Sequence, residues 1–274
     1  GREQGVMGRP AAITSARNPV AKRIRRLIST RKARHSEECF LVEGIKPVEM
    51  FLASGQSRMP VELAIVSSSF ADSCEGGRIM ELAGEERLVC LADSLMERLG
   101  DVRASQGVMA IARFAVQPPP DTRANGCYLL LDSLADPGNL GTLIRTAVGV
   151  GMDGILLFGE TVDIYNPKCV RATAGTLPFV SVWQVETELV RAFLSSGYRL
   201  FAACMDAEQG VFEADFGERA IIAVGNEAHG ISPELAEMAT DRVGIPLHAP
   251  CESLNAAIAG SLLMLLARRE MRGS

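Results

Sequence analysis

Short apolar runs alternate with helical patterns along the first 115 residues of the chain. Apolar runs at 39–44, 61–68, 87–92 and 107–114 are bounded by glycine or polar residues and are predicted to be strands. Helical patterns lie between them, around 47–53, 80–83 and 94–100. Strands that alternate with helices in this way indicate an α/β unit of about 100 residues.

A helical pattern rich in basic residues precedes these strands. Its apolar positions recur at helical spacing, at Val20, Ile24, Leu27 and Ile28. Asn18 followed by Pro19 is typical of a helix start. We predict a basic amphipathic helix over 19–34.

A second α/β pattern follows a break in the chain. Residues 116–126 contain three consecutive prolines and end in glycine, so we expect a linker between an N-terminal domain, 1–115, and a C-terminal domain, 127–274. Near-continuous apolar runs in the second domain predict a mainly parallel sheet with helices on both faces. The expected strands are 127–134, 154–159, 178–183, 199–204, 220–225 and 242–247, and the expected helices are 139–150, 167–173, 186–195 and 253–269.

The net charge conceals a strong asymmetry. The chain has a formal net charge of −5, yet residues 1–34 hold ten of its 28 Lys and Arg residues and one of its 33 acidic residues. A basic end on an acidic body is typical of a segment that binds a polyanion, although a solvated helix face is the alternative. The residues expected to contact such a polyanion are Arg17, Lys22, Arg23, Arg25 and Arg26.

Residue usage argues against several other classes of protein. The seven cysteines are widely spaced and indicate reduced thiols in a cytoplasmic protein. The three histidines form no metal-ligand motif, so we expect no metal site. The longest apolar stretch, 256–267, is too short to span a bilayer, and no secretory signal or membrane partner is expected.

One glycine motif has the wrong context. GVGMDG matches the GxGxxG pattern of dinucleotide-binding loops, but such a loop follows a strand and opens a helix. Gly149, Gly151 and Gly154 instead follow a helical pattern and precede a strand. We interpret them as a helix-to-strand turn, which disfavours a Rossmann-type oxidoreductase.

Three polar stretches follow predicted strands of the second domain, where open α/β sheets bind ligands. They are LDSLADPGNLGTLIRTAVGVG at 131–151, AVGNEAHGIS at 223–232 and IPLHAPCESLNAAIAG at 245–260. Together they resemble the three signature motifs of the SpoU (TrmH-like) ribose 2′-O-methyltransferases of the SPOUT superfamily. The matching residues are Asp136, Pro137, Asn139, Gly141 and Arg145, then Gly225, Asn226, Glu227, Gly230, Ile231 and Ser232, then Ile245, Pro246, Leu247, Ser253, Leu254, Asn255, Ala257 and Ala259.

The first domain is similar to the substrate-binding domain of the same family. FLVEG at 40–44 matches one of its strands, and SQG at 105–107 matches the entry to another, with Ser105 in place of the usual proline. The resemblance implies an RNA-binding domain joined to a trefoil-knot domain that methylates RNA with S-adenosylmethionine as a homodimer. The extra domain favours large-subunit (23S) ribosomal RNA as the substrate. A tRNA methyltransferase and a catalytically silent RNA-binding relative are the alternatives.

The resemblance also assigns roles to polar residues. Arg145, with an RNA phosphate, would orient the ribose hydroxyl and help to deprotonate it; otherwise it is a surface residue of its helix. Asn139 would hold Arg145, the phosphate or a strand end, or cap the helix. Glu227 would order a loop or a partner subunit, or bind the amides of its own turn. We expect Ser253 to cap the last helix and Asn255 to brace the knot or contact ligand.

The same resemblance places the methyl-donor pocket at strand ends. Gly225 would allow close approach of the backbone. Ile245 and Leu254 would pack on the adenine while backbone groups read its edge, unless both belong to the core. The residues expected to bind the donor are Gly225, Ile245, Leu254, Cys204, Asn226 and Leu247.

Overall fold

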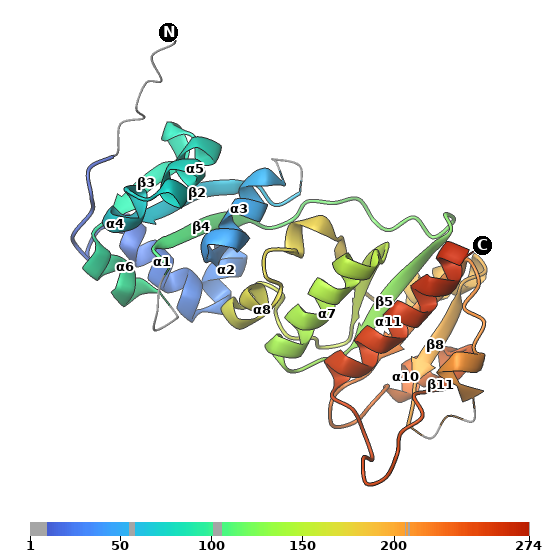
Figure 1. Cartoon of the computed structure of the whole chain (residues 1–274). Coiled ribbons are helices and arrows are strands. Elements are labelled where there is room, and N and C mark those ends of the chain that lie inside the picture. Colours follow the sequence, from blue (N-terminus) through green and yellow to red (C-terminus); the bar gives the residue numbers. More distant parts are fainter. Residues whose placement is uncertain (1–9, 55–57, 101–105, 206, 208, 274) are drawn as a thin grey trace. The chain divides into compact units, whose positions relative to one another are not determined.

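The computed structural model of the chain describes residues 10–54, 58–100, 106–205, 207 and 209–273 (Figure 1). The chain divides into two compact units. One contains the chain up to Val116 together with Tyr165–Pro178, and the other contains Gln117–Ile164 and Phe179–Ser274. The first boundary between the two units, after Val116, lies in the proline-rich segment. Tyr165–Pro178 also belongs to the first unit, although it comes from the C-terminal part of the sequence.

The first unit is built on a mixed sheet with the strand order β1-β4-β2-β3. β4 is antiparallel to β1 and β2, and β3 is parallel to β2. Its strands are β1 (Cys39–Glu43), β2 (Val61–Ser67), β3 (Leu88–Leu91) and β4 (Val108–Arg113). Its helices are α1 (Pro19–Ser29), α2 (Arg31–Glu37), α3 (Ile45–Ala53), α4 (Ser68–Ala71), α5 (Cys74–Ala83), α6 (Asp93–Leu99) and α8 (Pro167–Ala172).

Helices pack against both faces of this sheet. On one face, Ile24 of α1 and Leu95 of α6 join a buried cluster with Leu41 of β1. On the other, Phe51 of α3 contacts the ring of Phe40, the neighbour of Leu41 along the strand. Successive side chains of a strand point to opposite faces, so the sheet forms the middle layer of an α/β/α sandwich.

The single helix predicted over 19–34 is wrong, because Thr30 breaks it into α1 and α2. Thr30 adopts an extended conformation, with φ −134° and ψ 127°. The buried Arg34 of α2 turns back and donates a 2.9 Å hydrogen bond to the carbonyl of Leu27. This bond satisfies a carbonyl of the last turn of α1, which has no partner within that helix.

The Tyr165–Pro178 segment is anchored to β1 and to the end of β4 within the first unit. Tyr165 stacks on Phe114, with ring centroids 3.7 Å apart, and lies 4.8 Å from the ring of Phe40. Arg171 of α8 pairs with Glu43 at 3.3 Å. These contacts give a buried aromatic cluster to a unit whose main sequence ends at Val116.

The second unit is built on a seven-stranded sheet, and its paired strands are all parallel. The strand order is β7-β6-β5-β10-β8-β11-β9. The strands are β5 (Gly126–Asp132), β6 (Gly154–Phe158), β7 (Val182–Val185), β8 (Arg199–Ala203), β9 (Gln209–Gly210), β10 (Arg219–Val224) and β11 (Asp241–Gly244). The mainly parallel sheet expected from the apolar runs is therefore confirmed.

Helices cover both faces of this sheet as well. They are α7 (Pro137–Val150), α9 (Thr187–Ser195), α10 (Pro233–Met238) and α11 (Ala256–Gly273). Phe193 of α9 and Leu235 of α10 share a buried cluster with Tyr128 of β5. α7 and α11 pack against each other, and α11 also contacts β10 and β5. Gly260 permits this packing, because a Cβ there would lie 2.6 Å from a methyl carbon of Leu143 on α7.

Several predicted boundaries differ from the structure for local reasons. The strand predicted at 178–183 begins at Val182, because Leu177–Phe179 forms a 3-10 helix. The strand predicted at 242–247 ends at Gly244, shortly before Pro246, which has no N–H for a ladder bond. β9 and α10 were not predicted, since each is short and carries little periodicity.

The proline-rich segment is packed against the second unit. Gln117 donates a 2.6 Å hydrogen bond to the carbonyl of Val182. The indole of Trp183 donates a 2.8 Å bond to the carbonyl of Pro118. The GVGMDG glycines form the predicted turn, with Gly151 left-handed at the end of α7 and Gly154 opening β6.

Candidate active site

The three sequence motifs meet at one edge of the parallel sheet. β5 lies beside β10, β10 beside β8, and β8 beside β11. Parallel strands bring their carboxyl ends to the same edge, where the chain turns into the loops that carry the motifs. Asp136, Glu227 and Asn255 are far apart in the sequence, but their motifs therefore meet at this edge of the sheet.

Glu227 is the centre of a hydrogen-bond network in the second unit. Its carboxylate accepts bonds of 3.2 Å from the backbone N–H groups of Ala135 and Asp136. It also accepts a 3.0 Å bond from the side-chain amide of Asn139. Glu227 thus orders the loop that opens α7 by accepting from backbone amides outside its own turn.

Asn139 connects this network to the third motif. While its Nδ2 donates to Glu227, its Oδ1 accepts a 3.0 Å bond from Nδ2 of Asn255. The alternative that Asn139 caps α7 is wrong, because Asp136 is the cap and accepts from the backbone N–H of Asn139 at 2.8 Å. The chain Glu227–Asn139–Asn255 therefore joins one residue from each motif.

Asn255 rather than Ser253 caps the last helix. Its Oδ1 accepts from the backbone N–H groups of Ala257 and Ile258, at 2.8 and 3.3 Å. Ser253 lies two residues outside the helix, exposed, and its carbonyl accepts from the thiol of Cys251. The expectation that Ser253 caps this helix is wrong, because the helix begins at Ala256.

The electrostatic state of Glu227 follows from this network. Burial alone would raise its pKa, but the hydrogen bonds from Asn139 and from backbone N–H groups, including those of Ala135 and Asp136, outweigh it. The pKa of Glu227 therefore lies below its ordinary value. A group that stays ionised at neutral pH is suited to holding donors in place.

Arg145 is exposed on α7, and within the described part of the chain its guanidinium has neither a hydrogen bond nor an ion pair. It lies six residues beyond Asn139 on the same helix. An unpaired guanidinium offers several N–H donors to a phosphate or a developing oxyanion. The structure does not bring Arg145 into contact with Asn139, Glu227 or Asn255.

The residues expected to bind the methyl donor lie around the ends of β8, β10 and β11. Ile245 and Leu254 are half-buried and Leu247 is 37% exposed, which argues against the core alternative for the first two. The backbone N–H groups of Leu247 and Leu254 have no hydrogen-bond partner among the described residues. The N–H of Cys204 is already bound to the carbonyl of Val243 at 3.0 Å.

Gly225 is required by the loop that follows it. A Cβ at this position would lie 2.1 Å from the carbonyl carbon of Gly230. The loop closes on itself there, because Asn226 and Gly230 exchange two backbone hydrogen bonds of 2.9 Å. The group that approaches Gly225 is therefore the loop itself, and the expected approach of Gly225 to the methyl donor stays a prediction.

Sequence reasoning missed two residues at the end of β5. Asp132 is 1% exposed and accepts a 2.6 Å bond from the backbone N–H of Ser232. Ser133 adopts a left-handed conformation, with φ 54°, and its carbonyl accepts from the side chain of Asn226. A carboxylate that directly follows a buried apolar strand is the signal that could have identified Asp132.

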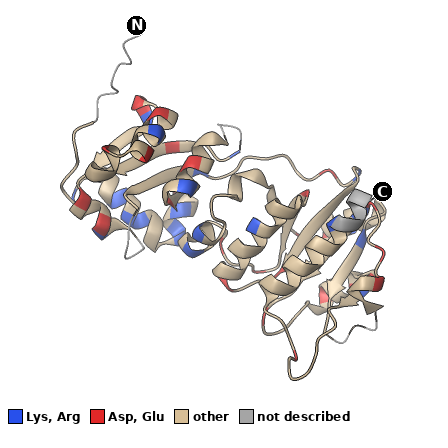
Figure 2. Ribbon diagram, viewed as in Figure 1, with Lys and Arg blue, Asp and Glu red and all other residues tan. Residues whose placement is uncertain are grey.

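The basic helices α1 and α2 divide their cations between two roles (Figure 2). Arg23 bonds to Glu37 and Glu62, and Arg26 also pairs with Glu37. Arg23, with a side chain only 27% exposed, therefore holds the helices to the sheet rather than facing solvent. Four exposed cations of this region have neither an ion pair nor a side-chain hydrogen bond among the described residues: Arg17, Lys22, Arg25 and Lys32.

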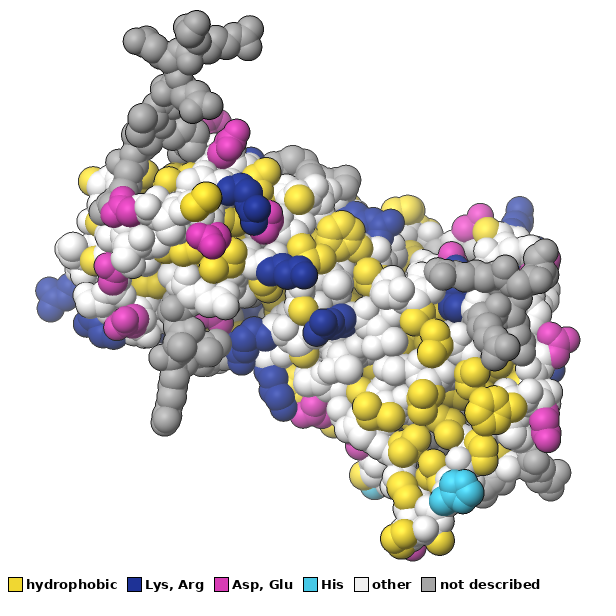
Figure 3. All heavy atoms as spheres, in the orientation of Figure 1, with side chains coloured by type: hydrophobic (Ala, Val, Ile, Leu, Met, Phe, Trp, Pro, Cys, Tyr) yellow, Lys and Arg dark blue, Asp and Glu magenta, His cyan; other side chains and the backbone are white. Residues whose placement is uncertain are grey.

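Apolar side chains gather on the surface of the second unit, where α11 runs (Figure 3). Ile258, Leu262 and Leu265 of this helix are 51%, 40% and 55% exposed. Their spacing of four and three residues places them on one face of the helix. No helix in the described part of the chain is both long enough and apolar enough to cross a membrane.

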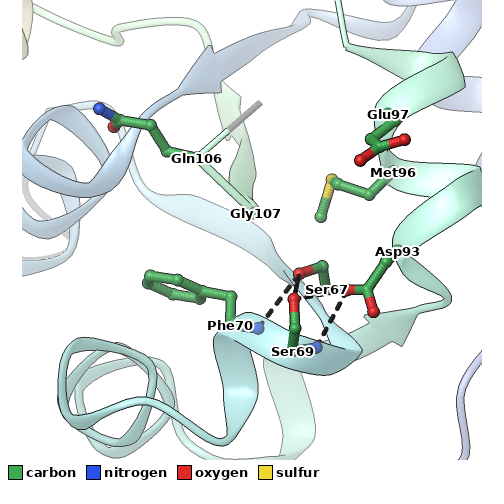
Figure 4. Close-up of a pocket in the computed structure, with 8 residues that line it drawn as sticks. All are labelled: Ser67, Ser69, Phe70, Asp93, Met96, Glu97, Gln106 and Gly107. Atoms are coloured by element: carbon green, nitrogen blue, oxygen red, sulfur yellow. Dashed lines mark hydrogen bonds between the residues drawn. The ribbon is translucent and has the colours of Figure 1, made fainter. Parts of the chain in front are cut away.

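A polar pocket of about 260 Å³ lies in the first unit, at the carboxyl ends of β2 and β3 (Figure 4). Ser69 donates to the carboxylate of Asp93 through its backbone N–H and its hydroxyl, at 3.0 and 2.8 Å. Ser67 accepts from the N–H of Phe70. The polar groups of the pocket are thus partly satisfied by one another.

Comparisons with known proteins find RNA methyltransferases that are similar to this chain. Residues 126–265 match the SpoU rRNA Methylase family, and residues 18–110 match the MRM3-like substrate binding domain. A tRNA/rRNA methyltransferase of Synechocystis is 33% identical over 95% of this chain and 94% of its own. A 23S rRNA uridine-2′-O-methyltransferase of Streptomyces viridochromogenes is 27% identical over 98% of this chain and 96% of its own.

Solved structures are similar over nearly the whole length. The AdoMet-bound rRNA methyltransferase of Sinorhizobium meliloti has a TM-score of 0.84 at 28% identity, covering 95% of this chain and 98% of that one. The SpoU methyltransferase AviRb of Streptomyces viridochromogenes, also with AdoMet, has a TM-score of 0.83 at 26% identity, covering 94% and 100%. The motifs, their meeting at one sheet edge and these matches lead to one conclusion: the chain belongs to the SpoU rRNA methylase family.

Proposed function

We propose that the chain transfers the methyl group of S-adenosylmethionine to a ribose 2′-hydroxyl of RNA. The observation that carries the proposal is the Glu227–Asn139–Asn255 network, which joins the three motifs on the same sheet edge. An exposed and unpaired Arg145 lies on the helix that this network opens. A catalytically silent relative would have no need to keep this combination.

Residues of the second unit fit the methyl donor. The backbone N–H groups of Leu247 and Leu254, which have no partner among the described residues, offer donors to a purine edge, and the half-buried side chain of Ile245 offers an apolar surface. S-adenosylmethionine supplies an activated sulfonium methyl group. The protein therefore needs only to orient the hydroxyl and to stabilise the charge that develops on its oxygen.

Arg145 is the residue we assign to that task. A guanidinium can bind an RNA phosphate through two parallel N–H groups and also stabilise a nascent alkoxide. Asn139 and Glu227 hold the loop that opens its helix, and Asn255 secures the start of α11. Ser253, which is exposed two residues before Asn255, is assigned to substrate contact.

The proposed substrate is 23S ribosomal RNA. Relatives aligned over almost the whole chain carry this substrate in their names, and the first unit matches a substrate-binding domain. The unpaired cations of α1 and α2 supply the positive charge that a phosphate backbone attracts. We assign RNA binding to the first unit and donor binding to the second.

The exposed face of α11 supports a homodimer. Ile258, Leu262 and Leu265 form a contiguous exposed apolar stripe. Single exposed apolar residues are common on protein surfaces, whereas a contiguous stripe is typical of an interaction site. Changing Ile258 and Leu262 to Glu should give a monomer in sedimentation velocity. We also propose a cytoplasmic protein, as its seven free thiols suggest.

A trefoil knot in the second unit is proposed from family membership and the order of its strands. β10 lies between β5 and β8, and the chain after β11 returns to place α11 against α7. Pulling the chain from both ends with optical tweezers should leave a contour length shorter than that of an unknotted chain.

The test of the proposed activity uses the full chain with isotopically labelled S-adenosylmethionine. Unmodified 23S rRNA and a tRNA pool are offered separately, and the product nucleosides are identified by mass spectrometry. Labelled 2′-O-methylnucleoside from 23S rRNA alone supports both parts of the proposal. Label in tRNA alone refutes the substrate, and label on a base or in neither RNA refutes the activity.

A further inference from the structure

The loop that carries Glu227 is held in place from outside itself. Residues 227–230 are all exposed, so burial does not fix their conformation. Glu227 nevertheless accepts hydrogen bonds from two backbone N–H groups and Asn139. A carboxylate can orient Asn139 only if the loop behind it has one conformation.

Asn226 fixes the start of this loop by using both ends of its amide. Its Oδ1 accepts from the backbone N–H groups of Ala228 and His229, at 2.9 and 3.2 Å. Its Nδ2 donates a 2.8 Å bond to the carbonyl of Ser133, at the end of β5. The side chain therefore closes the turn and ties it to the neighbouring strand.

Asp132 fixes the far end of the loop. Its Oδ2 accepts from the backbone N–H of Ser232, and its Oδ1 accepts from the hydroxyl of Ser133 at 3.1 Å. Asp132 is 1% exposed, and a buried carboxylate is tolerated where hydrogen bonds satisfy it. Asp132, the last residue of β5, and Ser133, which follows it, thus hold the two ends of the loop.

The left-handed conformation of Ser133 agrees with this arrangement. A non-glycine residue at positive φ is unfavourable and persists where the surroundings impose it. Here the imposed contacts are the Asn226 amide on its carbonyl and Asp132 on its hydroxyl.

We propose that Asp132 and Asn226 are positioning residues for methyl transfer, which act by holding the Glu227 carboxylate against Asn139. This inference rests on the proposed function. It assigns to the Asn226 side chain a role in loop geometry in place of the donor contact expected from the sequence, because both ends of its amide are already bonded.

The direct test is Asn226→Asp in the full chain. The change preserves shape and the Oδ1 acceptor, but it replaces the N–H donor with an oxygen that faces the Ser133 carbonyl. We expect the single-turnover methylation rate to fall by about tenfold to 100-fold at saturating donor and RNA. The dissociation constant for S-adenosylmethionine, measured by calorimetry, should stay within about twofold, since a positioning role leaves donor contacts in place.

A double-mutant cycle separates positioning from a general structural effect. If Asn226 acts through Glu227, Asn226→Asp should cost nothing further in a Glu227→Ala background. Additive losses would overturn the proposal. His229→Ala is the matched control, because within the described part of the chain His229 joins the network through its backbone N–H and not through its side chain.

A readout independent of activity completes the test. In wild-type protein, carbon-detected NMR should find the pKa of Glu227 below its ordinary value. Asp132→Asn should raise this pKa as the loop is released, although the change removes a negative charge. Asn226→Asp should raise it both by releasing the loop and by adding a negative charge beside Glu227. An unchanged Glu227 pKa in Asn226→Asp overturns the positioning role, even if Asp132→Asn fails to fold. If the variants show this change in the Glu227 pKa but the wild-type protein methylates no RNA, the proposed function alone is refuted.

Discussion

Asn139 donates a hydrogen bond of 3.0 Å to Glu227, although 88 residues separate the two in the sequence. The bond joins the first turn of α7, the helix that follows β5, to the loop after β10, and these two strands are adjacent in the sheet. Asn139 then accepts from Asn255, so a single side chain connects all three motifs. We therefore expect a change in any one motif to affect the geometry of the other two.

Glu227→Gln should reduce methylation although it preserves shape. The carboxylate accepts its bonds from N–H donors, and the amide of Gln would direct its own donors at one of them. We expect a loss of about tenfold to 100-fold in single-turnover rate. Glu237→Gln, on the exposed side of α10, is the control and should match wild type.

The lowered pKa of Glu227 gives a pH dependence with a definite sign. Because the folded-state pKa lies below the unfolded value of about 4.3, the contribution of this carboxylate to stability is complete above that value. It is lost as pH falls through the folded-state pKa. Urea unfolding of wild type and Glu227→Ala should therefore differ near neutral pH and converge in acid; a difference that grows in acid would contradict the direction of the shift.

We expect the cations of α1 and α2 that have no ion pair to bind RNA, and the paired Arg23 to stabilise the first unit. Changing Lys22, Arg25 and Lys32 together to Gln should weaken 23S rRNA binding and reduce its salt slope by about 0.9 for each phosphate that the variant no longer neutralises. Arg23→Gln should instead lower the melting temperature by about 3 °C, as it leaves Glu37 and Glu62 without their shared cation. Filter binding at several salt concentrations checks the first result, and calorimetry the second. Equal salt slopes for the triple variant and wild type would show that this face does not meet RNA.

Tyr165 should stabilise the first unit although it follows the proline-rich segment. Its ring is 9% exposed and stacks on Phe114. Tyr165→Ala should cost about 3 kcal/mol of unfolding free energy, a typical value for removing a buried aromatic side chain. Tyr165→Phe retains the ring and removes the 3.4 Å bond that the hydroxyl accepts from the N–H of Ala115, so it should be close to neutral. Equal unfolding midpoints for Tyr165→Ala and wild type would mean that this anchor carries no stability.

Sequence reasoning predicted the parallel sheet of the second unit because its strands are continuous apolar runs. It missed what depends on contacts between distant residues. Thr30 has no residue-level signal of a break, yet tertiary packing ends α1 there. The place of Tyr165 in the first unit follows from its stacking on Phe114, which no local pattern reveals.

The residues of the candidate active site were likewise predictable from the sequence only in part. The resemblance of the three motifs to those of the SpoU family identified Asn139, Glu227 and Asn255. The resemblance could not show that Asp136 caps α7 and so frees the Asn139 side chain to bridge the other two. Asp132 escaped notice because it reads as the polar end of an apolar strand.

Arg145→Ala tests the central claim most directly. Its guanidinium has no partner among the described residues, so the proposed partners, an RNA phosphate and the ribose oxygen, exist only in the RNA complex. Single-turnover methylation of 23S rRNA at saturating donor should fall by about 100-fold or more, and Arg145→Lys should recover little of it because an ammonium lacks the planar fork. Calorimetric binding of S-adenosylmethionine should remain near that of wild type. A single-turnover rate within about threefold of wild type, far short of the cost of removing a catalytic group, would contradict the account and remove Arg145 from the mechanism.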